Sequence, residues 1–176
     1  MLHPQSASRG GKVANVTPMD LVGVRVEIPA NTPMVLLQER DGDQRLLPIM
    51  IGGAEASAIH YALEGVEPPR PLTHDLFVNV LQTLGITLER VEVTEIRDHT
   101  FYAELHLNTS TGPKVVSSRP SDAIALAVRF GAPLFASDDL LDEVGQVPAP
   151  EPEEEQEEII DEFKDFLKTV NPDDFA

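Results

Sequence analysis

The sequence predicts an α+β domain in which a β-β-β-α unit occurs twice around a mixed or antiparallel sheet. Short β-branched and aliphatic runs, separated by turn residues, occur before residue 51 and again after residue 85. Each set of runs is followed by an alanine-rich segment that ends at a glycine. The two segments share a short pattern, EASAI at residues 55–59 and DAIAL at residues 122–126. Either duplication of one unit or chance accounts for this similarity.

The first unit contains three predicted strands and a helix. The strands are expected at residues 21–28, 34–39 and 45–51. Asp41, Gly42 and Asp43 are turn residues, so the second and third strands are predicted to form a hairpin. The helix is expected within residues 51–65, where Ile59 and Leu63 have helical spacing and a glycine ends the run.

An additional helix is predicted between the two units, over residues 74–85, with Thr73 as its N-cap. Its apolar stripe consists of Leu76, Phe77, Val80, Leu81 and Leu84. The second unit then repeats the order of the first, with strands at residues 86–96, 101–108 and 114–118 and a helix at 119–131. Small alanine side chains on both unit helices predict close packing against the sheet or against each other.

The chain is expected to have three parts: a disordered N-terminal extension (1–18), a folded domain (19–146), and an acidic linker with a C-terminal amphipathic helix (147–176). Of the net charge of −17, residues 138–176 carry −13. The tail has apolar residues on one predicted helix face, namely Ile159, Ile160, Phe163, Phe166, Leu167 and Val170. This face needs an apolar surface, which belongs either to this chain or to a neighbouring one.

Composition excludes several classes of protein. The chain has no cysteine, which excludes disulfides and thiolate chemistry. No apolar run approaches the roughly 18 residues that span a bilayer, and no signal peptide is evident, so we expect a soluble, cytoplasmic protein with no membrane partner. The chain has 13 basic residues against 30 acidic ones and no tryptophan, so composition does not support tight nucleic-acid binding.

Three blocks carry a resemblance to a known family: LPIMIGGAEASAI (47–59), RPLTHDLFVNVLQTLG (70–85) and SSRPSDAIALAVRFGAPLFAS (117–137). In this order they resemble the bifunctional nuclease domain family of bacteria and plants, over roughly residues 20–145. The resemblance implies a bacterial nuclease that hydrolyses DNA, RNA or both, and the composition predicts that this substrate is weakly held. The family's patterned polar positions fall on Glu55, Arg70, Thr73, His74, Asp75, Arg119, Pro120, Ser121 and Asp122.

The polar residues at the predicted helix starts supply the groups that metal-assisted phosphodiester hydrolysis needs. Carboxylates would hold Mg²⁺ or Mn²⁺, a base would activate water, and a cation would stabilise the charge that develops on the phosphate. The expected metal ligands are Asp75, Asp122 and Glu55. The expected catalytic residues are His74, Asp75, Asp122, Arg119 and Arg70, with His74 as the base and either arginine as the cation.

A structural hypothesis stands beside the catalytic one. The three acids lie in first turns of helices, where the helix dipole stabilises a carboxylate by about 0.3–1 kcal/mol without any catalytic role. Arg70 and Arg119 can equally pair with these acids. The alternative is then a non-catalytic regulatory or protein-interaction module with a structural Arg/Asp network, or a small-molecule pocket between the halves. Carboxylates that converge on one point would favour the catalytic hypothesis. Buried Arg–Asp pairs would favour the non-catalytic module.

Association is also predicted. Exposed strand edges and the amphipathic tail would leave unpaired backbone groups and apolar side chains in water, which favours a homo-oligomer, with a dimer as the simplest form. The acidic tail is expected to bind a basic partner or to screen nucleic acid.

Overall fold

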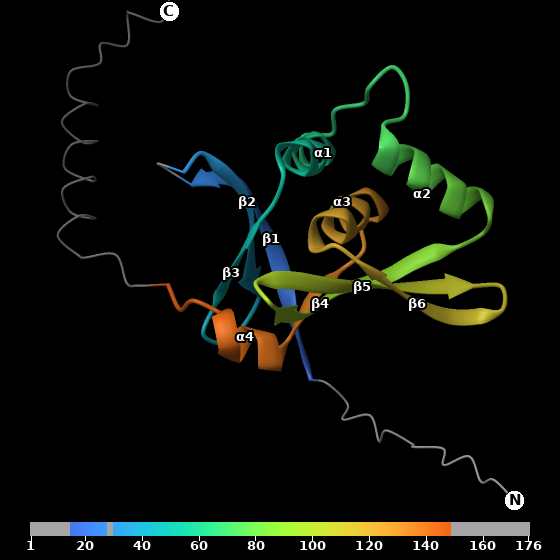
Figure 1. Ribbon diagram of the computed structural model, residues 1–176. Helices are drawn as coiled ribbons and strands as arrows, with labels where there is room; N and C mark the ends of the chain where they lie inside the picture. Colours follow the sequence, from blue (N-terminus) through green and yellow to red (C-terminus); the bar gives the residue numbers. More distant parts are fainter. Residues whose placement is uncertain (1–14, 28–29, 149–176) are drawn as a thin grey trace, which may run out of the picture.

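The computed structural model describes residues 15–27 and 30–148, which form an α+β fold with a seven-stranded mixed sheet and four helices (Figure 1). The strands are β1 (Val16–Glu27), β2 (Thr32–Glu39), β3 (Leu46–Met50), β4 (Thr87–Arg97), β5 (Thr100–Thr109), β6 (Gly112–Ser118) and β7 (Leu134–Ser137). The helices are α1 (Gly53–Leu63), α2 (Thr73–Thr83), α3 (Pro120–Phe130) and α4 (Asp138–Val144). The predicted fold class is confirmed.

The strand order in the sheet is β3-β2-β1-β7-β4-β5-β6. All neighbouring pairs are antiparallel except β4 and β7, which are parallel. The short strand β7 therefore joins two antiparallel three-stranded halves, each of which precedes a helix, α1 or α3. This is the element order that the sequence predicts, while duplication of one unit stays a prediction.

The sheet begins three residues before the predicted domain boundary at residue 19. Residues 16–19 pair with β7, a partner more than 100 positions away, which local sequence cannot reveal. Strand β1 thus begins at Val16, while the predicted division of the chain into three parts stays a prediction. Residues 1–14 of the predicted extension, and the predicted amphipathic helix of the tail, lie outside the described residues.

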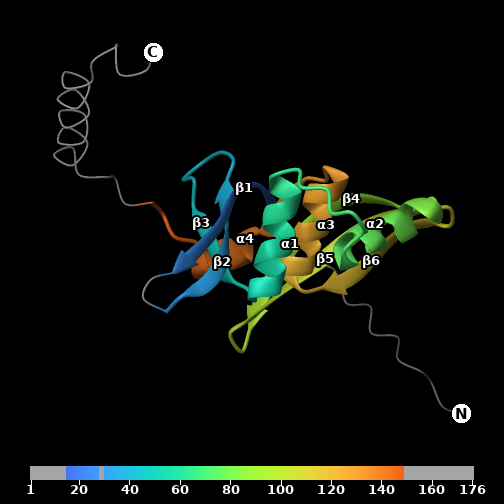
Figure 2. The ribbon, with the colours of Figure 1, turned by 90° about the horizontal axis from the view of Figure 1, so that it is seen from above.

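The core lies mainly between the sheet and helices α1 and α3, which pack on one face while α4 covers part of the other (Figures 1 and 2). Helix α3 is buried through most of its length, because its alanines Ala123, Ala125 and Ala127 allow close packing against α1 and the strands. This packing brings the first turn of α3 beside the first turn of α1, where Arg119 and Glu55 form an ion pair. No helix within residues 15–27 and 30–148 is long and apolar enough to cross a membrane.

Helix α2 lies at the edge of the helical layer and packs against α3 (Figure 2). Only Val78 and Leu81 are buried in it. The other apolar side chains of the predicted stripe, those of Leu76, Phe77, Val80 and Leu84, are exposed. Its N-cap is Leu72 rather than the predicted Thr73, because the helix begins one residue earlier than predicted; the Leu72 N–H donates a 2.8 Å hydrogen bond to the Asp75 carboxylate.

Candidate functional site

Polar side chains from the first turns of three helices meet on one side of the molecule. Glu55 comes from α1, His74 from α2, and Arg119 and Asp122 from the start of α3. Each helix begins after an extended residue, so its first turn projects from the loop that leads into it. The structure therefore brings together four of the sequence-predicted site residues, from three separate segments of the chain.

His74 and Asp122 form the closest contact between α2 and α3 in this cluster. The Nε2 atom of His74 lies 3.1 Å from Oδ1 of Asp122, and the side chains are 18% and 30% exposed. An ionised carboxylate only accepts hydrogen bonds, so Nε2 is the donor in this contact, and the neutral tautomer with this proton has its lone pair on Nδ1. This arrangement matches that of a general base oriented by an acid.

Arg119 connects the two carboxylates of the cluster. Its Nε and Nη2 donate to Asp122 at 2.7 and 2.9 Å, and its Nη1 lies 3.1 Å from Oε1 of Glu55. Burial raises the pKa of Asp122, but the hydrogen bonds from Arg119 and His74 outweigh that effect and leave it lowered. A guanidinium has five N–H groups, so those that face neither carboxylate remain for a ligand on a side chain that is 65% exposed.

Gly52 makes room for the Glu55 side chain. A Cβ atom at position 52 would collide with Oε2 of Glu55, whose carboxylate folds back over the start of α1. The glycine at this point therefore has a specific role in the site, because any larger residue must displace the carboxylate that pairs with Arg119.

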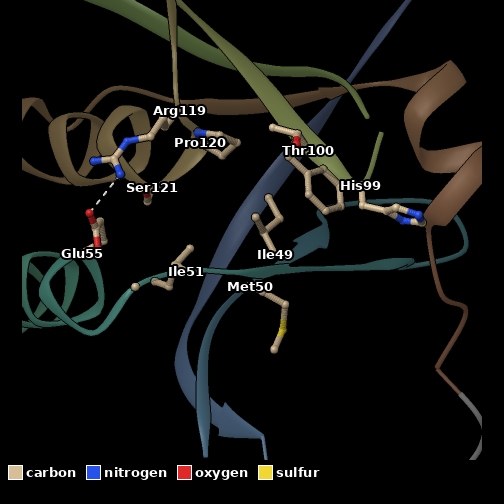
Figure 3. Close-up of a pocket in the computed structure, with 11 residues that line it drawn as sticks. Ile49, Met50, Ile51, Glu55, His99, Thr100, Arg119, Pro120 and Ser121 are labelled. Carbon is tan, nitrogen blue, oxygen red and sulfur yellow. Dashed lines mark ion pairs between the residues drawn. The ribbon is translucent and has the colours of Figure 1, made fainter. Parts of the chain in front are cut away.

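The cluster separates two cavities. The larger is an open groove of about 890 Å³ between α1, α2 and β6, and His74 and Asp122 line it. The smaller, of about 290 Å³, lies against β3 and the β4–β5 turn (Figure 3). Glu55 and Arg119 line both, and Figure 3 shows Arg119 reaching across to Glu55. This ion pair is thus a shared wall between the two spaces.

Asp75 does not join the cluster. Its Oδ1 accepts a 2.6 Å hydrogen bond from Nε of Arg129, which also donates to the carbonyl groups of Ala58 and Ala125. The Arg129 guanidinium holds the pKa of Asp75 below its usual range; burial opposes this effect, and the Leu72 N–H supports it. Arg129 is 11% exposed and contacts α1, α2 and α3, so this pair links the three helices. Sequence reasoning missed Arg129, since a basic residue in a last helical turn is ordinary.

Arg70 is exposed in the loop between α1 and α2 and forms no ion pair or hydrogen bond with other described residues. It lines neither the groove nor the smaller cavity. The structure therefore leaves Arg119, and not Arg70, as the cation beside His74 and Asp122.

The three predicted metal ligands do not form a metal site in this arrangement. Asp75 faces Arg129, while Glu55 and Asp122 both face the Arg119 guanidinium, whose positive charge stands where a cation would lie between them. Within the described part of the chain, no three His, Asp or Glu side chains are grouped to hold a metal ion. The residues thus do not fit Mg²⁺ or Mn²⁺ as placed.

Comparison with known proteins identifies the class to which this fold and site belong. The family model of the bifunctional nuclease domain matches residues 35–149, slightly later than the predicted 20–145. An uncharacterized protein of Mycobacterium tuberculosis is 44% identical over 160 residues, which cover 88% of this chain and 95% of that protein. The chain therefore belongs to the bifunctional nuclease domain family, as its sequence blocks predict.

Two plant relatives have names that refer to activity. Bifunctional nuclease 1 of Arabidopsis thaliana is 30% identical over 105 residues, which cover 58% of this chain and 32% of that protein. Bifunctional nuclease 2 of Oryza sativa subsp. japonica is 28% identical over 130 residues, which cover 72% of this chain and 40% of that protein. The shared region is thus less than half of each plant protein.

Proposed function

We propose that this protein is a nuclease that hydrolyses phosphodiester bonds at the groove where His74, Asp122 and Arg119 meet. The observation that carries the proposal is the 3.1 Å contact between His74 and Asp122 beside the exposed guanidinium of Arg119. A base, a group that orients it, and a cation are the parts that such a reaction needs. Membership of the family, and the names of its plant relatives, support the same activity.

The side chains have distinct roles in this mechanism. His74 accepts a proton on Nδ1 from the attacking water, whose oxygen forms a bond to phosphorus. The bond between phosphorus and the leaving oxygen breaks, and that oxygen takes up a proton from the imidazolium or from solvent. Asp122 keeps Nε2 protonated and stabilises the positive charge on His74. The N–H groups of Arg119 that face neither carboxylate donate to the phosphate oxygens.

The charge of the site predicts weak substrate binding. Glu55 and Asp122 together outweigh Arg119 by one negative charge when His74 is neutral, so an incoming phosphate competes with two carboxylates for one guanidinium. The small number of basic residues in the chain has the same effect. Catalysis then depends on orientation at the groove more than on affinity for the backbone.

Cleavage of labelled single-stranded and double-stranded DNA and RNA by highly purified full-length protein tests the proposal, in EDTA and with added Mg²⁺ or Mn²⁺. Asp122→Asn removes the negative charge that orients His74 and is expected to lower kcat by about 100-fold or more. Asp41→Asn, in the exposed β2–β3 turn, is the matched control and is expected to cleave like wild type. Circular dichroism and thermal unfolding must show that both variants are folded.

The same experiment separates this mechanism from the one with Mg²⁺ or Mn²⁺. Cleavage in EDTA that is lost in Asp122→Asn supports the His74–Asp122 mechanism. Cleavage that requires Mn²⁺ and is lost in a folded Asp75→Asn variant would instead support a metal site rebuilt around Asp75 in the presence of the ion. Equal cleavage by wild type and Asp122→Asn would contradict the His74–Asp122 mechanism, and equal cleavage by Asp75→Asn as well would contradict both.

A second candidate function is a non-catalytic regulatory or interaction module. Each of the three acids predicted as metal ligands pairs with an arginine, which is the arrangement that a structural network would have. Arg129 in particular ties α1, α2 and α3 together. Absence of cleavage under every condition above, by protein that is folded, would favour this function.

A further inference from the structure

We infer that the groove beside His74 and Asp122 binds an unstacked nucleobase, and that the protein therefore acts on single-stranded nucleic acid. The inference rests on the proposed nuclease function, and it names the part of the substrate that the apolar section of the groove recognises. That section is built from side chains that have no role in the hydrolysis itself.

Two aromatic side chains form part of the groove. Tyr61 comes from α1 and is 41% exposed, and Phe77 comes from α2 and is 48% exposed. The chain has nine Phe and Tyr residues in all, so two of the nine line this one groove with much of their surface in water. Aromatic side chains normally bury most of their area, and their exposure beside a catalytic cluster indicates a surface for stacking.

The rest of the groove fits a base as well. Leu72 and Val116 add further exposed apolar surface, while Ser117 on β6 contributes a hydroxyl group that can bond to the edge of a base. The volume of about 890 Å³ lies within the range of small-molecule sites, which is roughly 300–1,000 Å³. A nucleotide can thus place its base here while its phosphate reaches Arg119 at the polar end.

The charge of the protein favours single-stranded nucleic acid over duplexes as the substrate. A duplex is held mainly through its phosphates by arrays of lysine and arginine, and this chain has 13 such residues against 30 acids. Base stacking needs no net charge on the protein and contributes in single strands, whose bases are free. A paired base would first have to leave its duplex to enter the groove. The acidic chain and the aromatic groove thus favour the same substrate class.

The test is fluorescence anisotropy of full-length protein with a short, labelled oligothymidylate whose phosphorothioate linkages slow its cleavage. The same oligonucleotide with an abasic central position, and its duplex form, are the comparison ligands. Phe77→Ala is expected to weaken binding about tenfold, and Phe77→Tyr to retain it. Leu84→Ala is the matched control, since Leu84 is an exposed apolar residue at the C-cap of α2 and lies outside the groove.

Each outcome decides between the inference and the function on which it rests. Equal binding of the normal and abasic strands, with cleavage retained, would overturn the base site and leave the nuclease proposal intact. Base-dependent binding without any cleavage would support the base site and overturn the nuclease proposal. If sedimentation shows that Phe77→Ala converts a wild-type dimer into a monomer, a second copy covers the groove and the inference fails.

Discussion

His74 and Asp122, 48 positions apart in the sequence, are joined by a 3.1 Å contact between Nε2 and Oδ1 that links the first turns of α2 and α3. Two elements that pack through few buried side chains thus share a polar contact in the wall of the groove. Since α2 buries only Val78 and Leu81, this contact and the Asp75–Arg129 pair fix how α2 lies on the domain. The position of the proposed base therefore depends on the same contacts that hold the helix.

This contact predicts energetic coupling between the two residues. In a double-mutant cycle of His74→Ala and Asp122→Ala, the free energies of unfolding should be non-additive by about 0.5–1.5 kcal/mol, because each change alone removes the same hydrogen bond. Urea denaturation at neutral pH measures the cycle. Additivity within roughly 0.3 kcal/mol would show that the two side chains do not interact in solution.

The Asp75–Arg129 pair predicts an acid-dependent loss of stability. The pKa of Asp75 is lower in the folded protein, so the pair stabilises fully above the unfolded value near 3.8 and its contribution is lost as pH falls through the folded value. Asp75→Asn should reduce the free energy of unfolding by about 1–3 kcal/mol at neutral pH. The difference from wild type should shrink between about pH 5 and about pH 3. A difference that stays constant over this range would contradict the assignment.

Replacement of Arg45, which lies outside the candidate site, is expected to lower the free energy of unfolding strongly. Its Nη2 lies 2.7 Å from Oε1 of Glu39, and its Nη1 lies 2.7 Å from Oδ1 of Asp142 in α4. The Glu39 side chain is only 5% exposed. Arg45→Gln leaves the Glu39 carboxylate without its cation and should cost about 3 kcal/mol. Arg40→Gln removes a solvent-exposed partner of Asp20 and should change stability little. Equal urea midpoints for the two variants would contradict this prediction.

Replacement of Gly131 is expected to lower the free energy of unfolding through backbone strain alone. It ends α3 with φ of 64°, in the left-handed region, where alanine is strained although no neighbouring atom would touch its Cβ. Gly131→Ala should therefore cost about 1 kcal/mol and leave kcat unchanged. Gly53→Ala, at the first residue of α1 with an ordinary φ and open space, should be neutral or slightly stabilising. Thermal unfolding compares the two, and equal losses would refute the argument.

Much of the fold follows from local pattern. The runs that became β2, β4 and β5 are long and rich in β-branched and apolar residues, and α1 and α3 end at glycines, so sequence alone predicts them. The strand β7 has only four residues and pairs with β1 and β4, which lie far away in the chain. Neither it nor the seven-residue helix α4 has a pattern strong enough to predict.

The sequence predicts which residues form the candidate site, but it does not predict which of them contact one another. The helix starts identify Glu55, His74, Arg119 and Asp122 from the sequence. Which acid faces which arginine depends on how α2 crosses α3, and that crossing depends on packing between segments distant in sequence. The same crossing exposes Phe77, which its helical spacing had placed on the buried stripe.

The measurement that tests the central claim most directly is cleavage of labelled single-stranded RNA by His74→Gln beside His60→Gln, both purified in parallel with wild type. His60 is exposed on α1 and lines neither cavity, so it controls for loss of an imidazole. We predict that His74→Gln lowers the cleavage rate by about 100-fold or more, while His60→Gln cleaves like wild type. Equal rates for the two folded variants would contradict the assignment of His74 as the base.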